Sequence, residues 1–236
     1  PMPTDDAPMR FVALGSEYDG AFAQFCRLPA DQLFDVSSAP LSDVEIAAIP
    51  CAHGTAFNLL TRAGVAPGED VLITGASGGV GLAAVALARL LGARVTAVAS
   101  PAKQAVVRDE GAQAVLDRGA TPPPRSFDAV IDVVGGPGFQ GLLAALKPGG
   151  RYAVSGAIAG PVVEADLRVI YLSDLTLFGC TFAPRGVFAR LIEMVNAGRV
   201  RPRVSRTYPL AEIARAQADF AAKAHPGKLV LIPPRD

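Results

Sequence analysis

The sequence has no tryptophan and is poor in cysteine, histidine and methionine, with three, two and three of them among 236 residues. The cysteines, Cys26, Cys51 and Cys180, are far apart and odd in number, so they do not indicate a disulfide framework. Lys and Arg balance Asp and Glu at 22 each, without a basic run. The electrostatic footprint of a nucleic-acid or membrane-surface binder is therefore missing, and we expect a small-molecule partner.

Long uninterrupted apolar runs are also missing. The most apolar stretch, residues 80–99, is broken by Arg89, Gly92 and Arg94, which is unlike a transmembrane helix. The first ten residues, PMPTDDAPMR, are acidic and proline-rich, unlike a signal peptide. Half of the residues are apolar, which is enough for a well-filled core. We therefore expect a soluble, cytoplasmic protein.

From Asp70 onward, strand patterns alternate with helix patterns. Because the strands are apolar on nearly every residue, they indicate a parallel sheet buried on both faces. The prediction is an α/β fold with a doubly wound, parallel, six-stranded Rossmann sheet over about residues 69–180. The crossing at residues 118–126, RGATPPPRS, contains three consecutive prolines and is predicted to be an extended loop. Strands are expected at residues 70–75, 94–100, 114–117, 127–136, 151–156 and 174–180, and helices at 78–93, 103–112 and 138–150.

The two ends of the chain show other patterns. Residues 10–36 contain short apolar runs between turn residues, which predict short strands. Ser42 and Glu45 form a capping box that begins a short helix, ended by Pro50, and a second helix is expected over about residues 54–62. The tail predicts a helix at 186–198, a strand and a helix within 203–224, and a strand within 227–234.

The segment TGASGGVG, residues 74–81, fits three enzyme patterns. As G-x-S-x-G it is a serine elbow, with Ser77, for example Asp174, and His225 in the chain order of an α/β-hydrolase. A five-residue match is common by accident, so this is the weakest alternative. A short-chain dehydrogenase needs lysine four residues after a tyrosine, which this sequence never provides. The residues at those positions are Phe22, Gly156, Leu175 and Glu212.

The third pattern is the glycine-rich turn of a dinucleotide site. A strand, a turn and a helix place backbone N–H groups and the positive helix end against a pyrophosphate. Gly78 allows the backbone to approach the phosphate, and Gly81 allows close packing of helix and strand. Ala76 replaces the first glycine of the pattern, which a strand end with negative φ tolerates. The cofactor-binding residues predicted in this turn are Ala76, Ser77, Gly78, Gly79, Val80 and Gly81.

The end of the second strand indicates which dinucleotide is bound. NAD sites place Asp or Glu there, about 20 residues beyond the turn. This sequence has Ala-Ser-Pro-Ala-Lys at residues 99–103, without a carboxylate. A hydroxyl and a lysine would hold the 2′-phosphate that a carboxylate would repel. We therefore predict NADP as the cofactor, with Ser100 and Lys103 as discriminators and Arg118 as a third contact. The alternative for Lys103 is a solvated residue, although cations usually avoid a helix start.

Three segments resemble a known family. They are PCAHGTAFNLL (50–60), the strand–turn–helix–strand segment 64–100, and DVVGG (132–136). In this order they resemble the medium-chain dehydrogenases/reductases, in particular the zinc-independent, quinone-oxidoreductase-like branch. The resemblance runs from about residue 20 to the closing segments YPLAEIARAQADF and GKLVLIP. It implies a partial GroES-like catalytic domain, residues 1–50 and 181–236, around an NADP-binding Rossmann domain, residues 51–180.

The resemblance implies further site residues. Thr55 matches a family threonine that lies close to the cofactor. Cys180 and Thr181 end the sixth strand at the carboxyl edge of the sheet, where ligands bind. The run DLTLFGCTF, residues 174–182, is the expected pairing edge of a homodimer. Further cofactor contacts are expected from Val134 and Gly135 in DVVGG, and from Ser155, Gly156 and Ala157 after the fifth strand.

The resemblance also implies that most of the front half of the catalytic domain lies outside this sequence, including two of the usual zinc ligands. Cys51 occupies a position where zinc-dependent members place a ligand, and the alternative is a small buried residue packed at the cleft. An open catalytic zinc site needs three protein ligands, and only this one is visible. No metal site is therefore predicted.

The expected reaction is hydride transfer from NADPH to a quinone, an enone or a carbonyl compound. Quinone reduction can take its proton from solvent, whereas carbonyl reduction needs an acid or a metal. His53 is the only group by the expected cleft that titrates near neutral pH, and its alternative is a loop histidine without a role. The catalytic residues stay unknown. The other functions considered are a zinc-dependent alcohol dehydrogenase and a non-catalytic nucleotide-binding fragment.

Overall fold

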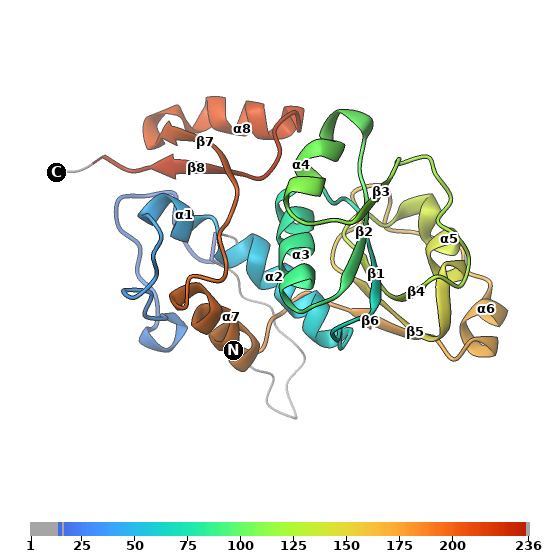
Figure 1. The fold of residues 1–236 in the computed structure, drawn as a ribbon. Coiled ribbons are helices and arrows are strands. Elements are labelled where there is room, and N and C mark those ends of the chain that lie inside the picture. Colours follow the sequence, from blue (N-terminus) through green and yellow to red (C-terminus); the bar gives the residue numbers. More distant parts are fainter. Residues whose placement is uncertain (1–13, 16, 235–236) are drawn as a thin grey trace.

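The computed structural model describes residues 14–15 and 17–234, and its largest element is a parallel sheet (Figure 1). The strand order is β3–β2–β1–β4–β5–β6, so the order reverses between β1 and β4. This confirms the predicted doubly wound, Rossmann-like sheet. Its strands are β1 (Asp70–Ile73), β2 (Arg94–Val98), β3 (Ala114–Leu116), β4 (Phe127–Asp132), β5 (Leu146–Val154) and β6 (Thr176–Gly179).

Helices cover both faces of the sheet. Successive side chains of a strand point to opposite faces, so Val71 and Ile73 pack in one core and Leu72 in the other. The first core lies beneath α2, α3, α4 and α7, and the second beneath α5 and α6. No described helix is long and apolar enough to cross a membrane. The helices are α1 (Asp43–Ala47), α2 (Pro50–Arg62), α3 (Gly79–Leu90), α4 (Gln104–Asp109), α5 (Phe139–Ala144), α6 (Leu167–Leu172), α7 (Arg185–Asn196) and α8 (Ile213–Ala222).

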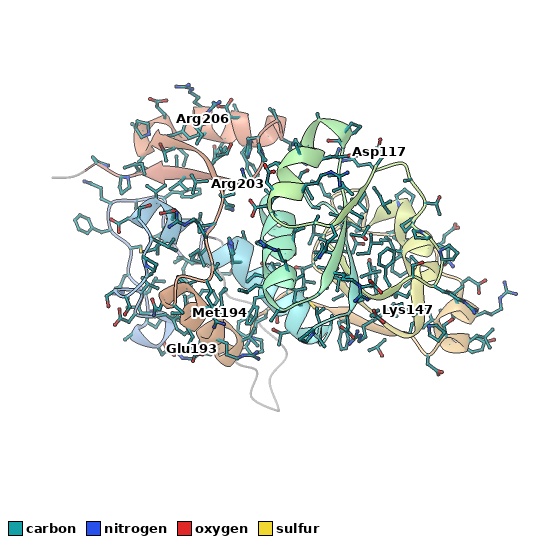
Figure 2. The ribbon with its side chains drawn as sticks, in the orientation of Figure 1. Asp117, Lys147, Glu193, Met194, Arg203 and Arg206 are labelled. Carbon is teal, nitrogen blue, oxygen red and sulfur yellow. The ribbon has the colours of Figure 1, made fainter. Side chains whose placement is uncertain are left out.

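The tail forms a separate βαβ unit. Strands β7 (Val204–Pro209) and β8 (Lys228–Ile232) pair in parallel and are connected through α8. We call β7, α8 and β8 the tail unit. Figure 1 shows the end of α8 beside α4, and Figure 2 shows Arg203 between the tail unit and α3. Arg203 pairs with Glu110 at 2.5 Å, which ties the tail unit to the end of α4.

The connection from β3 to β4 contains no helix, as its three prolines predicted.

The strands expected near the start of the chain are a wrong prediction. Within the described part of residues 10–36, there is one isolated bridge, Leu14–Tyr18, and one short turn, Ala30–Gln32, but no strand. Residues 10–13 and 16 of that segment lie outside the described residues. Apolar runs form strands only when a neighbour pairs with their backbone, and no described strand does so here.

The second helix begins earlier than predicted. It starts at Pro50, not near Gly54, because proline is well suited to the first turn of a helix. The predicted capping box is confirmed: the Ser42 hydroxyl accepts from the Glu45 N–H, and the Glu45 carboxylate accepts from the Ser42 N–H.

Ion pairs close the amino edge of the sheet. Lys147 contacts Asp70 at 2.9 Å and Asp128 at 2.8 Å, and Arg94 contacts Asp70 at 2.7 Å. The hydrogen bond from Arg94, with help from Lys147, lowers the pKa of Asp70 to about 2. Figure 2 places Lys147 at the opposite end of the sheet from Asp117, which follows β3. The carboxyl edge, marked by Asp117, is where ligands bind in this type of fold.

Candidate functional site

The turn after β1 leads directly into α3. Gly81 lies so close to it that an added Cβ would sit 2.1 Å from the Gly75 carbonyl oxygen and 2.6 Å from the Ala76 Cα. The packing role predicted for Gly81 is therefore confirmed. Ala76 is fully buried and has no positive φ, as predicted, whereas Gly75 has φ +56°. Gly75, which was not among the residues predicted from the sequence, is thus the one that needs the left-handed conformation.

The amino end of α3 is open to an anion. Gly78 caps this helix in an extended conformation, and an added Cβ there would meet nothing closer than 3.5 Å. The N–H groups of a first helical turn have no partner within the helix, and the macrodipole adds partial positive charge. The geometry fits a pyrophosphate at the N–H groups of Gly79 and Val80, beside Gly78, whose own N–H donates to the Gly75 carbonyl at 3.0 Å.

A buried carboxylate holds the loop after β4. Asp132 is fully buried and accepts hydrogen bonds from the Thr74 hydroxyl (2.5 Å), the Tyr152 hydroxyl (2.5 Å) and the N–H of Val134 (2.9 Å). Burial and the neighbouring Asp132 raise the pKa of the Tyr152 hydroxyl, which stays a proton donor. This network, which was not predicted from the sequence, fixes the loop backbone.

Three loops meet at the carboxyl edge. A Cβ on Gly75 would lie 2.9 Å from a methyl of Val134, and a Cβ on Gly135 would lie 3.1 Å from the Cα of Ala157. The loops after β1, β4 and β5 are therefore in contact, as a nicotinamide dinucleotide site requires. The predicted residues that these loops bring together are Ala76, Ser77, Gly78, Val134, Gly135, Ser155, Gly156 and Ala157.

The predicted discriminators follow β2 and β3. Val98 pairs with Leu116, so Ser100 and Arg118 each follow the carboxyl end of a neighbouring strand by two residues. The ammonium of Lys103 donates a hydrogen bond of 2.6 Å to the carbonyl of Lys223. Lys103 is half-buried, and this bond uses one of its three N–H donors and leaves two for solvent or a ligand, so both interpretations of Lys103 stay open.

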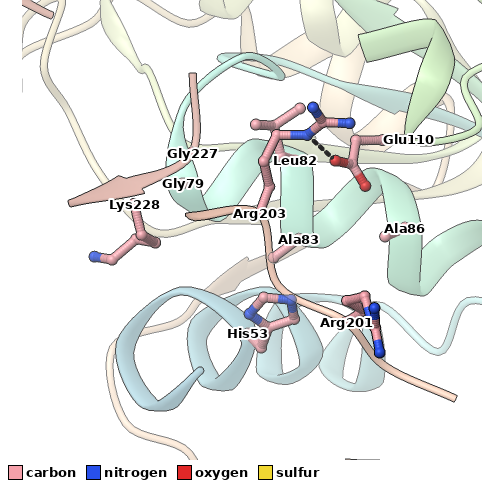
Figure 3. A pocket seen from close by; sticks show the side chains of 10 residues that line it. All are labelled: His53, Gly79, Leu82, Ala83, Ala86, Glu110, Arg201, Arg203, Gly227 and Lys228. Atoms are coloured by element: carbon pink, nitrogen blue, oxygen red, sulfur yellow. Dashed lines mark hydrogen bonds and ion pairs between the residues drawn. The ribbon is translucent and has the colours of Figure 1, made fainter. Parts of the chain in front are cut away.

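Lys228 is a cation at this site that was not predicted from the sequence. An added Cβ on Gly79 would lie 2.8 Å from the Lys228 Cδ, so the lysine stem packs on the first turn of α3 (Figure 3). Lys228 lies far downstream, in GKLVLIP, and only the packing of the tail unit brings it here. It adds a positive charge beside the end of α3 that already attracts anions.

His53 does not have the properties predicted for a proton donor. Its side chain is only 4% exposed and lines a cavity of about 10 Å³, room for about one water, together with Gly79 and Arg201 (Figure 3). Burial, assisted by the charge of Lys228, lowers the pKa of His53 to about 4. The imidazole is therefore neutral at pH 7. Its Nδ1 has no hydrogen-bond partner among the described residues. Thr55, two residues further along α2, is half-buried.

The described residues do not fit a catalytic zinc site. Cys51 is exposed, which also contradicts the alternative of a small buried residue. His53 lies two residues further along α2, and residues at this spacing face different sides of a helix. Across residues 14–15 and 17–234, no three His, Cys, Asp or Glu side chains gather as metal ligands.

The structure contradicts the hydrolase alternative in the form of Ser77 with Asp174 and His225. Asp174 lies two residues before β6, at the amino edge of the sheet, whereas Ser77 follows β1 at the carboxyl edge. A strand of four residues separates these edges by roughly 13 Å, so the two side chains cannot share one histidine. His225 lies instead in the tail unit, where the charges of Lys103 and Asp219 act on it.

Comparison with known proteins identifies the family. A family model described as zinc-binding dehydrogenase matches residues 101–231, more than half of the chain. The acryloyl-coenzyme A reductase of Metallosphaera sedula is 32% identical over 225 residues, which cover 93% of this chain and 67% of that protein. The chain belongs to the medium-chain dehydrogenase/reductase superfamily. This confirms the superfamily that the glycine turn and the GTA segment predicted.

Solved structures of these oxidoreductases share the fold. A candidate alcohol dehydrogenase from Sinorhizobium meliloti 1021 is 44% identical, with a TM-score of 0.90, over 98% of this chain and 66% of that one. The 2-octenoyl-CoA carboxylase reductase CinF, solved with NADP and 2-octenoyl-CoA, is 28% identical, with a TM-score of 0.79, over 86% of this chain and 52% of that one. This medium-chain dehydrogenase/reductase chain thus spans about two thirds of the first relatives' length and about half of CinF.

Proposed function

We propose that this chain forms the cofactor-binding part of an NADPH-dependent oxidoreductase that reduces an electron-poor double bond. Among quinones, enones and carbonyl compounds, the relatives favour the enone-like class, in particular 2-enoyl thioesters of coenzyme A. The observation that carries the proposal is the open amino end of α3, held against β1 by Gly81 at the edge where three loops meet.

Several groups of this chain would hold the cofactor. The first turn of α3 and Lys228 would bind the pyrophosphate, while Ser100, Lys103 and Arg118 would bind the 2′-phosphate. The loops after β4 and β5 would orient the nicotinamide ring, because Asp132 fixes the backbone between them. When bound, NADPH supplies the hydride.

The proton for the reduced double bond comes from water in this proposal. Saturating an enoyl thioester adds a proton at the α-carbon, a step that solvent can perform without a side-chain acid. This agrees with the state of His53, which is neutral and buried at pH 7. The resident groups of this chain therefore bind and orient the reactants.

Calorimetry and NADPH oxidation together test the proposal. We expect NADPH to bind more tightly than NADH, and Lys103→Glu to abolish that preference because its carboxylate repels the 2′-phosphate. Addition of crotonyl-CoA should then oxidise bound NADPH. No affinity for either dinucleotide would refute the proposal. Binding without turnover, with crotonyl-CoA and with a quinone, would favour the non-catalytic nucleotide-binding function instead.

A zinc-dependent alcohol dehydrogenase is the second candidate. It is suggested by the description of the matching family model alone, because the accessible thiol of Cys51 has no further metal ligands gathered around it among the described residues. The distinguishing experiment is zinc binding by calorimetry, with Cys51→Ser as the control. Stoichiometric binding that this variant abolishes would support the metal-dependent function.

We also propose that β6 pairs with a second copy of the chain. This strand forms one edge of the sheet, and Leu177 and Phe182, 40% and 45% exposed, lie on it and just beyond it. An edge strand with exposed apolar side chains is a template for pairing. Sedimentation should show a dimer that Leu177→Lys dissociates, whereas a monomeric wild-type protein would refute the pairing.

A further inference from the structure

Asp132 bonds to all three loops that meet at the carboxyl edge of the sheet. Its carboxylate accepts from the Thr74 hydroxyl, just before the turn after β1, and from the N–H groups of Val134 and Gly135 in the loop after β4. Its backbone carbonyl accepts from the Ser155 N–H, where the loop after β5 begins, at 3.0 Å. These loops hold the residues predicted to surround the cofactor, so Asp132 adjoins the proposed site.

The hydrogen-bond partners of Asp132 fit its ionised form. The Thr74 hydroxyl accepts from the Val133 N–H at 3.2 Å and directs its own proton to the first carboxylate oxygen. The hydroxyl of Tyr152, a buried residue, donates to the second oxygen. With donors at both oxygens, a proton on the carboxyl group would have no acceptor and would leave a buried hydroxyl without one. Asp132 therefore carries a negative charge.

This charge is fully buried and has no cationic partner among the described residues. The ion pairs within residues 14–15 and 17–234 do not include Asp132. Its hydrogen bonds stabilise the carboxylate but leave its net charge, and salt screens a buried charge little. Asp128, four residues earlier on β4, differs because Lys147 pairs with it at 2.8 Å at the amino edge. Asp132 therefore exerts a negative field on the loops around it.

We propose that the charge of Asp132 makes the site favour the oxidised cofactor over the reduced one. In the proposed reaction a hydride passes to the double bond, water supplies the proton, and the nicotinamide ring is left with one positive charge. This charge develops in the transition state and is absent from the reduced ring, so an anion at the site favours release of the hydride. The inference rests on the proposed NADPH function. It adds that Asp132 determines the specificity for the redox state and drives the reaction toward reduction of the substrate.

Calorimetry with both forms of the cofactor tests the inference. The quantity measured is the Kd of NADPH divided by the Kd of NADP⁺, which reports the preference for the oxidised form. Asp132→Asn removes the charge and keeps the size of the side chain. It should lower this ratio about tenfold, because charges interact strongly at the reduced effective dielectric of a protein interior. For a two-electron couple this corresponds to a rise of about 30 mV in the reduction potential of the bound cofactor.

Two control variants and one fragment separate charge from structure. Asp128→Asn removes a carboxylate from the same strand at the opposite edge of the sheet, and should leave the ratio unchanged. Tyr152→Phe keeps the charge and removes one of its donors, so the ratio should rise about twofold as the charge becomes less compensated. Adenosine 2′,5′-bisphosphate lacks the nicotinamide ring and should bind Asp132→Asn and the wild-type protein equally.

The outcomes distinguish this inference from the proposed function. If neither form of the cofactor nor the bisphosphate binds the wild-type protein, the proposed function fails and the inference fails with it. If both forms bind and Asp132→Asn keeps the wild-type ratio, only the inference is overturned. A tenfold loss of bisphosphate affinity in this variant would show damage to the site and would overturn it too.

The controls carry the remaining outcomes. If Asp128→Asn lowers the ratio as much as Asp132→Asn does, general electrostatics explains the effect and the inference is wrong. If Asp132→Asn does not fold, Tyr152→Phe decides alone: a raised ratio supports the inference, and an unchanged or lowered ratio overturns it.

Discussion

Replacement of Gly81 by alanine is the sharpest test of how α3 is placed. The new Cβ would lie 2.1 Å from the Gly75 carbonyl oxygen and 2.6 Å from the Ala76 Cα. Both are backbone atoms, so neither can rotate away. Ordinary contact would require α3 to move outward by roughly 1 Å, since nonbonded atoms pack at about 3.5 Å. The helix end would then leave the position at which it faces a pyrophosphate.

The expected loss of stability combines two effects. Overpacking of this kind costs about 1–3 kcal/mol, whereas alanine in place of glycine within a helix gains about 0.5–1 kcal/mol. We therefore expect Gly81→Ala to lower the free energy of unfolding by about 1–2 kcal/mol. The displaced helix end should also weaken NADPH binding at least tenfold, which corresponds to about 1.4 kcal/mol.

Urea unfolding and calorimetry provide the measurement. The midpoint should fall at an unchanged slope, because only the stability differs. The matched control is Gly141→Ala in α5, where an added Cβ meets nothing within 4 Å. That variant should gain about 0.5–1 kcal/mol from helix propensity alone. If Gly81→Ala unfolds and binds NADPH like the wild-type protein, the argument for close packing of α3 on β1 is refuted.

Three further predictions follow from the same edge of the sheet. Lys228→Gln should weaken the binding of NADPH and NADH about equally in calorimetry, because the pyrophosphate is common to both; a change in their ratio would contradict this placement. Tyr152→Phe should lower the free energy of unfolding in urea by about 1–2 kcal/mol, since buried Asp132 loses a donor, and an unchanged midpoint would speak against the network. The pKa of His53 is lowered from 6.5 to about 4 in the folded protein, so between these values the unfolded chain binds more protons and stability falls as the pH falls. The loss reaches about 3 kcal/mol at most, and thermal unfolding of His53→Gln should be less dependent on pH over this window; equal slopes would refute this cause.

The central sheet and the glycine turn could be predicted because their determinants are local. Strands such as Val71–Ile73 are apolar on every residue, which only a sheet covered on both faces explains. The spacing of Gly78 and Gly81 placed the turn between strand and helix. The contact of each of these residues with a cofactor stays a prediction, as do the domain boundaries.

The rest of the site depends on contacts between distant segments. The network of Asp132 forms only because β4 lies between β1 and β5, an order that no short segment specifies. A polar residue at the end of an apolar strand was the one hint available. Lys228 reaches α3 through the packing of the tail unit, and the same packing brings Lys223 to Lys103.

The predictions that were wrong share a physical cause. Apolar runs within residues 10–36 look like strands, but backbone pairing needs a partner that the run itself does not encode. His53 looks like a group that titrates near neutral pH, yet burial in α2 removes this property. Cys51 looks like a small buried residue in the alternative interpretation, yet the first turn of the same helix leaves its thiol exposed.

The helix-free crossing at residues 118–126 divides the sheet into two halves of three strands each. In the sheet these halves are joined by the pairing of β1 with β4, and side-chain bonds such as Lys147–Asp70 and Thr74–Asp132 add to it; none of them involves Pro122–Pro124. We therefore expect this crossing to tolerate nicking or a long inserted segment, since extending a surface loop carries only a small entropic penalty. Two separately expressed polypeptides, one ending and the other beginning in this loop, would then associate through β1 and β4 and reconstitute a single nucleotide-binding sheet.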